Sequence, residues 1–264
     1  MLKQRWDTIG IWAVLLFMPA PIIIVAAASF SHDGYIQFPP GELSLRWYQE
    51  FLTDARWLRA LVVSLGLAIA GALLSTTVAF LAALAVSRRQ TAFTRYFEVA
   101  VMTPLLFPHA ALGVAMLSLL MMIGGYGTFA GLLLVHCIIT LPYAYRPISV
   151  SLRKLDREME EASMSMGARN WYTFRHVTLP LVRPGIITAL LFSFILSFDE
   201  VTVTMFLVGP FITTLPVETY SFIQESGTPV VAAISTVLVV MTLLLVILLE
   251  RLVGLEFFVE PDRK

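Results

Sequence analysis

The sequence predicts an all-α integral membrane protein with six transmembrane helices, forming a single transmembrane domain over residues 1–264. Hydrophobic residues make up 58% of the chain and charged residues only 14%, whereas a soluble domain carries about 25% charged residues. The mean hydropathy is +0.82, and long runs of the sequence contain no charge at all. This composition is typical of a multi-pass membrane protein.

Six stretches are long and apolar enough to cross a bilayer, which takes about 20 residues in a helix. The first is longer than the apolar core of a signal peptide, about 15 residues at most, so we expect it to be retained. Pro104 and Pro108 predict a kink near His109 in the third stretch, and Pro142 predicts a bend in the fourth. The six are Thr8–Phe30, Ala60–Val86, Val99–Ile123, Phe129–Val150, Gly185–Val208 and Val230–Leu252.

The basic residues predict the orientation of these spans, because Lys and Arg concentrate in cytoplasmic loops. With the N-terminus in the cytoplasm, 15 of the 18 Lys and Arg residues lie on the cytoplasmic side. Only Arg46, Arg56 and Arg59 then lie outside. Six spans return the chain to the cytoplasm, so both termini are predicted to be cytoplasmic.

The first outer loop is predicted to contain an amphipathic helix. Leu43, Trp47, Tyr48 and Phe51 recur at helical spacing in the segment that runs up to Leu58. Such a helix either anchors the loop at the membrane interface or contributes to a docking face for an external partner. The sequence leaves both roles open.

Residues 151–184 form the longest cytoplasmic segment and are predicted to contain two short helices. Gly167 follows the first helix, where a glycine in the left-handed conformation can end it. The second helix, Trp171–Val177, is expected to be terminated by Leu179-Pro180. The first helix either inserts its apolar face into a groove on a soluble motor protein or lies on the inner leaflet. Its apolar stripe consists of Leu152, Leu155, Met159, Ala162 and Met166.

This segment carries a motif with fixed spacing. Glu161-Ala162-Ser163 is followed by three residues, Gly167, nine residues and Val177-Thr178-Leu179-Pro180. The pattern resembles the EAA motif of ABC importer permeases, which reads Glu-Ala-Ala, three residues, Gly, nine residues, Ile-x-Leu-Pro. Ser163 and Val177 are conservative departures from it.

The resemblance covers roughly Ala60–Leu252 and is closest to spermidine/putrescine permeases. Ser197-Phe198-Asp199-Glu200-Val201, with Phe206 and Gly209-Pro210 downstream, looks like the Ser-Leu-Asp-Asp-Val stretch of that subfamily. The resemblance implies a type I importer bundle in the bacterial inner membrane. It also implies a second permease subunit, two ATP-binding cassette ATPase subunits and a periplasmic substrate-binding protein. Residues Glu161–Gly167 would form the coupling helix, with Glu161 and Gly167 as its most sensitive positions.

The sequence lacks the signatures of catalysis. It contains no Gly-x-x-x-x-Gly-Lys-Ser/Thr phosphate-binding loop, and Gly124-Gly125-Tyr126-Gly127 is too short and has no lysine. No residue spacing suggests a metal site, a cofactor or a nucleophile–base pair, and the zero net charge gives no support for a nucleic-acid partner. We therefore expect a non-enzymatic subunit, with ATP hydrolysed by its partners.

Two adjacent acids fall inside the predicted fifth span. Asp199 and Glu200 would lie about 20 Å along its helix at 1.5 Å per residue. An acid at membrane depth is a functional candidate, because exposure of its charge to lipid costs at least ~2.5 kcal/mol. Asp199 is predicted to line or gate the substrate path, with Glu200 supporting the gate or pairing with the partner permease. The alternative is a structural network with Thr202 or Thr204.

His109 and His136 also lie in apolar spans, and we interpret both as packing residues rather than proton carriers.

The predicted function is therefore a permease subunit that forms half of the translocation path for a small cationic solute, and the subfamily resemblance favours a polyamine. Other cargoes in the same family remain open: another amine, an opine-like amino acid derivative or an aminophosphonate. A proton-coupled secondary transporter is the alternative from a different class, since intramembrane acids and histidines can carry protons.

Overall fold

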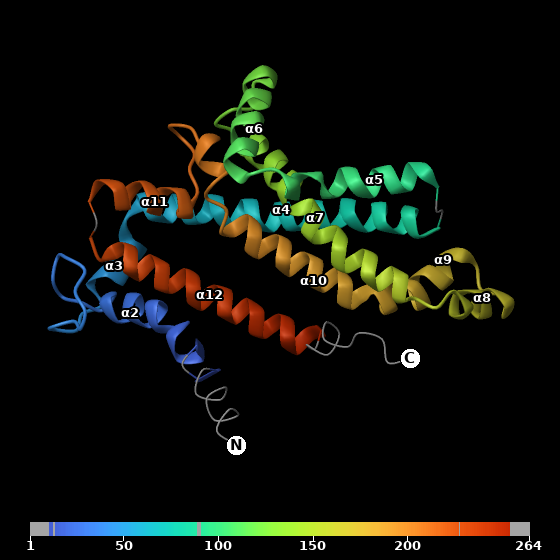
Figure 1. Ribbon diagram of the computed structural model, residues 1–264, viewed down its shortest axis with the longest axis horizontal. Helices are drawn as coiled ribbons and strands as arrows, with labels where there is room; N and C mark the ends of the chain where they lie inside the picture. Colours follow the sequence, from blue (N-terminus) through green and yellow to red (C-terminus); the bar gives the residue numbers. More distant parts are fainter. Residues whose placement is uncertain (1–10, 13, 89–90, 227, 254–264) are drawn as a thin grey trace. The chain divides into compact units, whose positions relative to one another are not determined.

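The computed structural model describes residues 11–12, 14–88, 91–226 and 228–253, and these are mostly helical (Figure 1). The described residues contain two isolated β-bridges, Ser31 with Leu43 and Gly209 with Ile212. The chain divides into two compact units. One falls within Met1–Arg59 and Glu218–Leu243, and the other within Ala60–Val217 and Leu244–Lys264.

Four helices in the described part of the chain are long and apolar enough to cross a membrane. They are Ala55–Arg88 (α4), Phe129–Lys154 (α7), the continuous run Asn170–Phe198, and Val230–Leu252 within α12 (Val230–Val253). These correspond to the second, fourth, fifth and sixth predicted spans. The first predicted span is represented by a shorter apolar helix, Val14–Ala28, whose last part is α2 (Ala20–Ala28). Residues 8–10 and 13 of that predicted span lie outside the described residues.

The third predicted span is broken rather than kinked. Helix α5 (Ala92–Met102) continues into a 3-10 turn, η1 (Thr103–Leu106), and α6 (His109–Ile123) then leaves at 108°. Pro108 stands at the break in an extended conformation, with ψ of 132°, and it has no N–H to continue the helical ladder. If the bent pair counts as one span, the structure has up to five.

The fifth predicted span is displaced along the sequence. The helix begins at Asn170 (α9, Asn170–Thr173), passes through a π-helical turn (η2, Phe174–Thr178), and ends with α10 (Leu179–Phe198). Only the three-residue turn η3 (Thr204–Phe206) is helical between Asp199 and Val208. The prediction that the span continues to Val208 is therefore wrong.

The first unit contains the outer-loop helix predicted from the sequence, but it is shorter than expected. Helix α3 spans Arg46–Thr53, and the extended Asp54 separates it from α4, to which Leu58 belongs. Trp47 and Phe51 are buried, and the Trp47 indole donates to the Ser31 carbonyl at 2.8 Å. The apolar face of α3 thus packs against the loop that precedes it.

In the same unit, Arg56 joins the start of α4 to α11 (Leu215–Glu225). Its guanidinium lies 4.5 Å from the ring centre of Trp57 and 4.8 Å from that of Phe222. Its Nε is also 3.5 Å from a carboxylate oxygen of Glu218. Stacking of an arginine on aromatic faces at such distances stabilises the contact between two helices.

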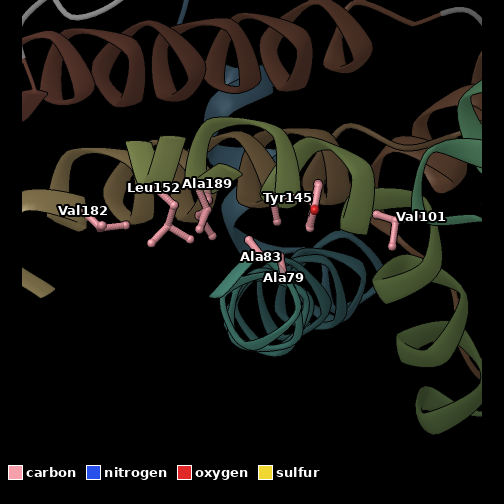
Figure 2. Close-up of a cluster of buried hydrophobic side chains, with 9 residues drawn as sticks. Ala79, Ala83, Val101, Tyr145, Leu152, Val182 and Ala189 are labelled. Carbon is pink, nitrogen blue, oxygen red and sulfur yellow. The ribbon is translucent and has the colours of Figure 1, made fainter. Parts of the chain in front are cut away.

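The core of the second unit forms where α4, α7 and α10 meet (Figure 2). Ala79 and Ala83 of α4 are fully buried, and such small residues let membrane helices approach closely. Gly185 does the same for α7 and α10, because a Cβ atom there would lie 2.8 Å from the Pro147 carbonyl oxygen. The rest of this cluster consists of Ala144, Tyr145, Ile148 and Leu152 of α7, Val182 and Ala189 of α10, and Val101 of α5.

Candidate functional site

The candidate coupling helix is α8 (Arg157–Ser165), and it has a defined start and end. The Asp156 carboxylate caps its N-terminus by accepting from the Glu158 N–H at 2.9 Å. At the other end Gly167 has φ of +91°, the left-handed conformation expected from the sequence. The Gly167 and Ala168 N–H groups bond back to the Met164 and Ser163 carbonyls at 2.9 and 3.2 Å, which is a Schellman motif.

The predicted apolar stripe on this segment does not form a single face. Leu152 belongs to α7, and Leu155 caps its end, because the chain turns at Leu155 and Asp156 before α8 begins. Met159 and Met166 are exposed, Met166 at 91% of its surface. The structure thus corrects the prediction that all five residues lie on one helix.

A buried carboxylate that sequence reasoning missed attaches α8 to the bundle. Glu160 is only 3% exposed. Its two oxygens accept from both terminal nitrogens of Arg88, the last residue of α4, with Nη2 at 2.6 Å from Oε1. The Thr178 hydroxyl, at the end of η2, donates to the same carboxylate. Glu160 therefore connects α8 to α4 and to the start of α10.

These bonds set the charge state of the carboxyl group. Hydrogen bonding from the Arg88 guanidinium lowers the pKa of Glu160, although burial acts in the opposite direction. The Thr178 hydroxyl adds to the lowering. Glu160 is thus an anion at neutral pH, held by a cation and a hydroxyl donor.

Most motif residues in and just after α8 are exposed and take no part in this attachment. Glu161, Ala162 and Gly167 are exposed, while Ser163 is half-buried and bonds the Thr173 hydroxyl at 3.0 Å. Glu160 and Ser163 are three residues apart, so they share one face of α8. The helix is held by that narrow face, and the rest of its circumference is open.

The helix beyond the loop is not terminated at Leu179-Pro180, contrary to the prediction. The Leu179 N–H bonds to the Phe174 carbonyl, five residues back, so the helix widens into a π turn just before the proline. Pro180 occupies the first turn of α10, where the missing N–H is tolerated. The motif's Leu-Pro thus lies inside a helix that runs directly into a span.

Asp199 and Glu200 are placed differently from the prediction, because α10 ends at Phe198. Asp199 is the exposed C-cap residue of α10. Glu200 accepts a 2.7 Å bond from the Val203 N–H, and its other oxygen lies 3.5 Å from His109 Nδ1. Glu200 therefore braces the turn after α10 and faces the start of α6, whereas Asp199 is open.

His136 is a packing residue, as expected, whereas His109 is exposed and the prediction that it packs is wrong. His136 is buried on α7 and contacts the Ser197 hydroxyl at 2.8 Å and the Thr204 hydroxyl at 3.1 Å. Thr204 thus pairs with His136 rather than with the acids. Ser197 and Thr204 lie on either side of the break after α10, so His136 holds the two sides together.

Most of the chain matches a known transport family. Residues 75–255 match the family described as binding-protein-dependent transport system inner membrane component. The chain belongs to this family. Members of it are permease subunits rather than ATPases, and this chain is a type I ABC importer permease of the inner membrane, crossing it several times.

The permease resembles transporters with different cargoes. It is 31% identical to the spermidine/putrescine transport system permease protein PotC of Haemophilus influenzae, covering 90% of this chain and 92% of the relative. It is 29% identical to the putative 2-aminoethylphosphonate transport system permease protein PhnV of Salmonella typhimurium, covering 92% and 91%.

A solved structure shares the fold of the permease. This is a bacterial alginate ABC transporter in complex with an alginate pentasaccharide-bound periplasmic protein, with a TM-score of 0.71 at 15% identity. The likeness covers 96% of each chain. At this identity it shows the fold and leaves the cargo open.

Proposed function

We propose that this permease forms half of the translocation path for a small cationic solute, a polyamine such as spermidine or putrescine. Separate ATPase subunits drive alternating access between the two sides of the membrane. The chain crosses the membrane six times with both termini in the cytoplasm, which the uneven distribution of Lys and Arg supports.

The observation that carries the mechanism is the two-sided arrangement of α8. One face is fixed to α4 and to the start of α10 through Glu160. The exposed surface of α8 presents Glu161 and Ala162 of the motif together with Met159, and Gly167 is exposed just beyond the helix. A helix held in this way can enter a groove on an ATPase and pass its movement to two spans at once.

The assembly proposed around this chain has a second permease subunit, two ATP-binding cassette ATPases and a periplasmic substrate-binding protein. The family description names binding-protein dependence. The alginate transporter that shares this fold was solved with its loaded periplasmic protein. Both support an external partner that delivers the cargo.

A cationic cargo is supported by the relatives and by Asp199. PotC, whose name specifies spermidine and putrescine, matches nearly the whole chain. Asp199 lies exposed at the end of α10, next to the turn that Glu200 braces, where it can offer negative charge to an amine. PhnV is an equally extensive match, so 2-aminoethylphosphonate, which also carries an amine, is the second candidate cargo.

Uptake by cells carrying the complete operon tests the proposal. We expect saturable uptake of labelled spermidine or putrescine, abolished by Gly167→Asp and weakened by Asp199→Asn. Gly34→Asp and Glu250→Gln are the matched controls, because Gly34 has open space around it and Glu250 is an exposed acid near the end of α12. Uptake of 2-aminoethylphosphonate but of neither polyamine would reassign the cargo.

Dependence on the ATPases separates this proposal from a proton-coupled transporter. The His109–Glu200 contact at 3.5 Å is the feature that could serve proton coupling. Uptake that persists after the ATPase catalytic glutamates are replaced, and that collapses with a protonophore, would favour proton coupling and contradict the proposal.

The orientation can be measured with single cysteines, since Cys137 is the only natural one. In a Cys137→Ala background, we expect Met166→Cys to react with a membrane-impermeant maleimide only after cells are opened. Gly34→Cys is expected to react from the periplasm. The reverse pattern would refute the proposed orientation.

A further inference from the structure

A cavity of about 1090 Å³ in the second unit lies between the end of α4, the start of α5 and the end of α7. Its lining is strongly basic. Four guanidinium groups face it, against one carboxylate. These are Arg88, Arg95, Arg153 and Arg157, with Glu98 as the acid.

Three of the four arginines have partners, and the fourth has none among the residues that the structure describes. Arg88 binds Glu160, Arg153 binds Glu98 at 2.7 Å, and Arg157 donates to the Ser87 carbonyl. Within the described part of the chain, the Arg95 side chain makes no hydrogen bond or ion pair. The first turn of α5, with its positive end of the helix dipole, lines the same cavity through Ala92 and Thr94. An anion there would meet a prearranged positive field.

A second cavity, of about 480 Å³, adjoins the first and differs from it in character. The two share Glu98, Ser149 and Arg153 as lining residues. The lining of the second cavity includes three apolar side chains that are exposed at the protein surface, Leu105, Leu106 and Val150. The pair of cavities therefore leads from a basic chamber to an apolar groove.

We propose that these joined cavities bind an anionic phospholipid, with its phosphate headgroup in the arginine chamber and an acyl chain along Leu105, Leu106 and Val150. A phosphate diester matches the guanidinium donors, and basic chambers between membrane helices suit anionic headgroups. The apolar groove selects a lipid over a free phosphate, because only an amphiphile fills both cavities. Placement in the cytoplasmic leaflet rests on the proposed orientation, whereas the site itself does not.

The site also contacts the proposed coupling element. Arg88 lines the cavity and binds Glu160 of α8, and Arg157 is the first residue of α8. A bound headgroup would therefore touch the same guanidinium that attaches α8 to the bundle. This offers a route by which lipid composition affects coupling between ATP hydrolysis and transport.

The test uses the purified, assembled transporter and native mass spectrometry, so it does not depend on knowing the cargo. Phosphatidylglycerol is titrated against phosphatidylcholine of the same chains, with inorganic phosphate as the headgroup-only probe. We expect preferential retention of phosphatidylglycerol, weakened about fivefold by Arg95→Gln, the loss expected for one arginine at a membrane surface. Arg251→Gln, an exposed arginine outside the cavity, is expected to have no effect.

A second variant isolates the acyl groove. Leu106→Asn is expected to weaken phosphatidylglycerol retention without changing competition by inorganic phosphate. Equal retention of the two lipids, or equal effects of Arg95→Gln and Arg251→Gln, would overturn the proposal. So would displacement of phosphatidylglycerol by phosphate at matched concentration, which would identify a free-anion site. A failed uptake assay with lipid retention intact would instead bear only on the proposed transport function.

Discussion

Arg88, the last residue of α4, forms a bidentate ion pair with Glu160, the one buried carboxylate of α8, although the two residues are 72 positions apart in sequence. Thr178 completes the arrangement from the turn that leads into α10. The Glu160 carboxylate is thus the buried contact in the attachment of the candidate coupling helix, and its contribution can be tested directly.

Removal of the Glu160 carboxylate should loosen α8. We expect Glu160→Ala to lower the free energy of unfolding by ~2 kcal/mol, since it removes charged hydrogen bonds and leaves the Thr178 hydroxyl buried without its acceptor. The Arg88 side chain is already 45% exposed to water, so its charge is not left fully buried and the loss is limited. Thermal unfolding of the purified complex measures this change.

The matched control for that variant is Glu158→Ala, on the exposed side of the same helix. We expect it to change stability by less than about 0.5 kcal/mol. Equal losses for the two variants would show that Glu160 does not attach α8.

The same ion pair predicts a pH dependence. Because the pKa of Glu160 is lowered in the folded protein, its contribution to stability is complete above the unfolded value, about 4.3. The contribution is lost as the pH falls through the lower folded value. The difference in thermal midpoint between wild type and Glu160→Gln should therefore be constant from pH 8 to 6 and shrink below about pH 4. A difference that grows on acidification would contradict this assignment.

Gly167 is expected to require a residue that tolerates positive φ. At φ of +91° a β-branched side chain is strained by about 1–2 kcal/mol, whereas asparagine adopts left-handed conformations more readily. We expect Gly167→Asn to retain more ATP-driven uptake than Gly167→Val, although both have open space around the new side chain. Equal activity of the two would mean that the backbone conformation at the end of α8 is not needed.

Gly185 should be intolerant of even one added carbon. A Cβ atom there would lie 2.8 Å from the Pro147 carbonyl and closer still to the Ser151 hydroxyl. We expect Gly185→Ala to destabilise the α7–α10 contact by roughly 1–3 kcal/mol. Gly66→Ala on α4 is the control, because its Cβ would meet Phe129 at an ordinary 3.4 Å. Thermal unfolding of both variants measures the difference in stability. A Gly185→Ala protein as stable as the Gly66→Ala control would contradict the close packing.

Much of the fold could be predicted because the signals are local. Apolar runs of the right length locate α4, α7 and α12 without any knowledge of their neighbours. The left-handed end of α8 follows from a glycine after a helical stretch. The spacing from Glu161 to Pro180 identified the family, and the family match across residues 75–255 confirmed it.

The errors arose where a helix depends on distant contacts. The sequence around Asp199 has no glycine or proline to end α10, so the break could not be seen from composition. At Leu179-Pro180 the predicted helix end is absent, because a π turn accommodates a proline that local rules treat as a helix terminator.

The sequence by itself determined the membrane class, the places of the second, fourth and sixth spans, and the family, because hydrophobic length and motif spacing are local properties of the chain. The tertiary structure alone decided which of two adjacent acids is buried. Glu160 and Glu161 have the same chemistry and the same helix propensity, and only the rotation of α8 against Arg88 and Thr178 distinguishes them. A side chain's partner is a property of three-dimensional packing, which no local pattern in the sequence records.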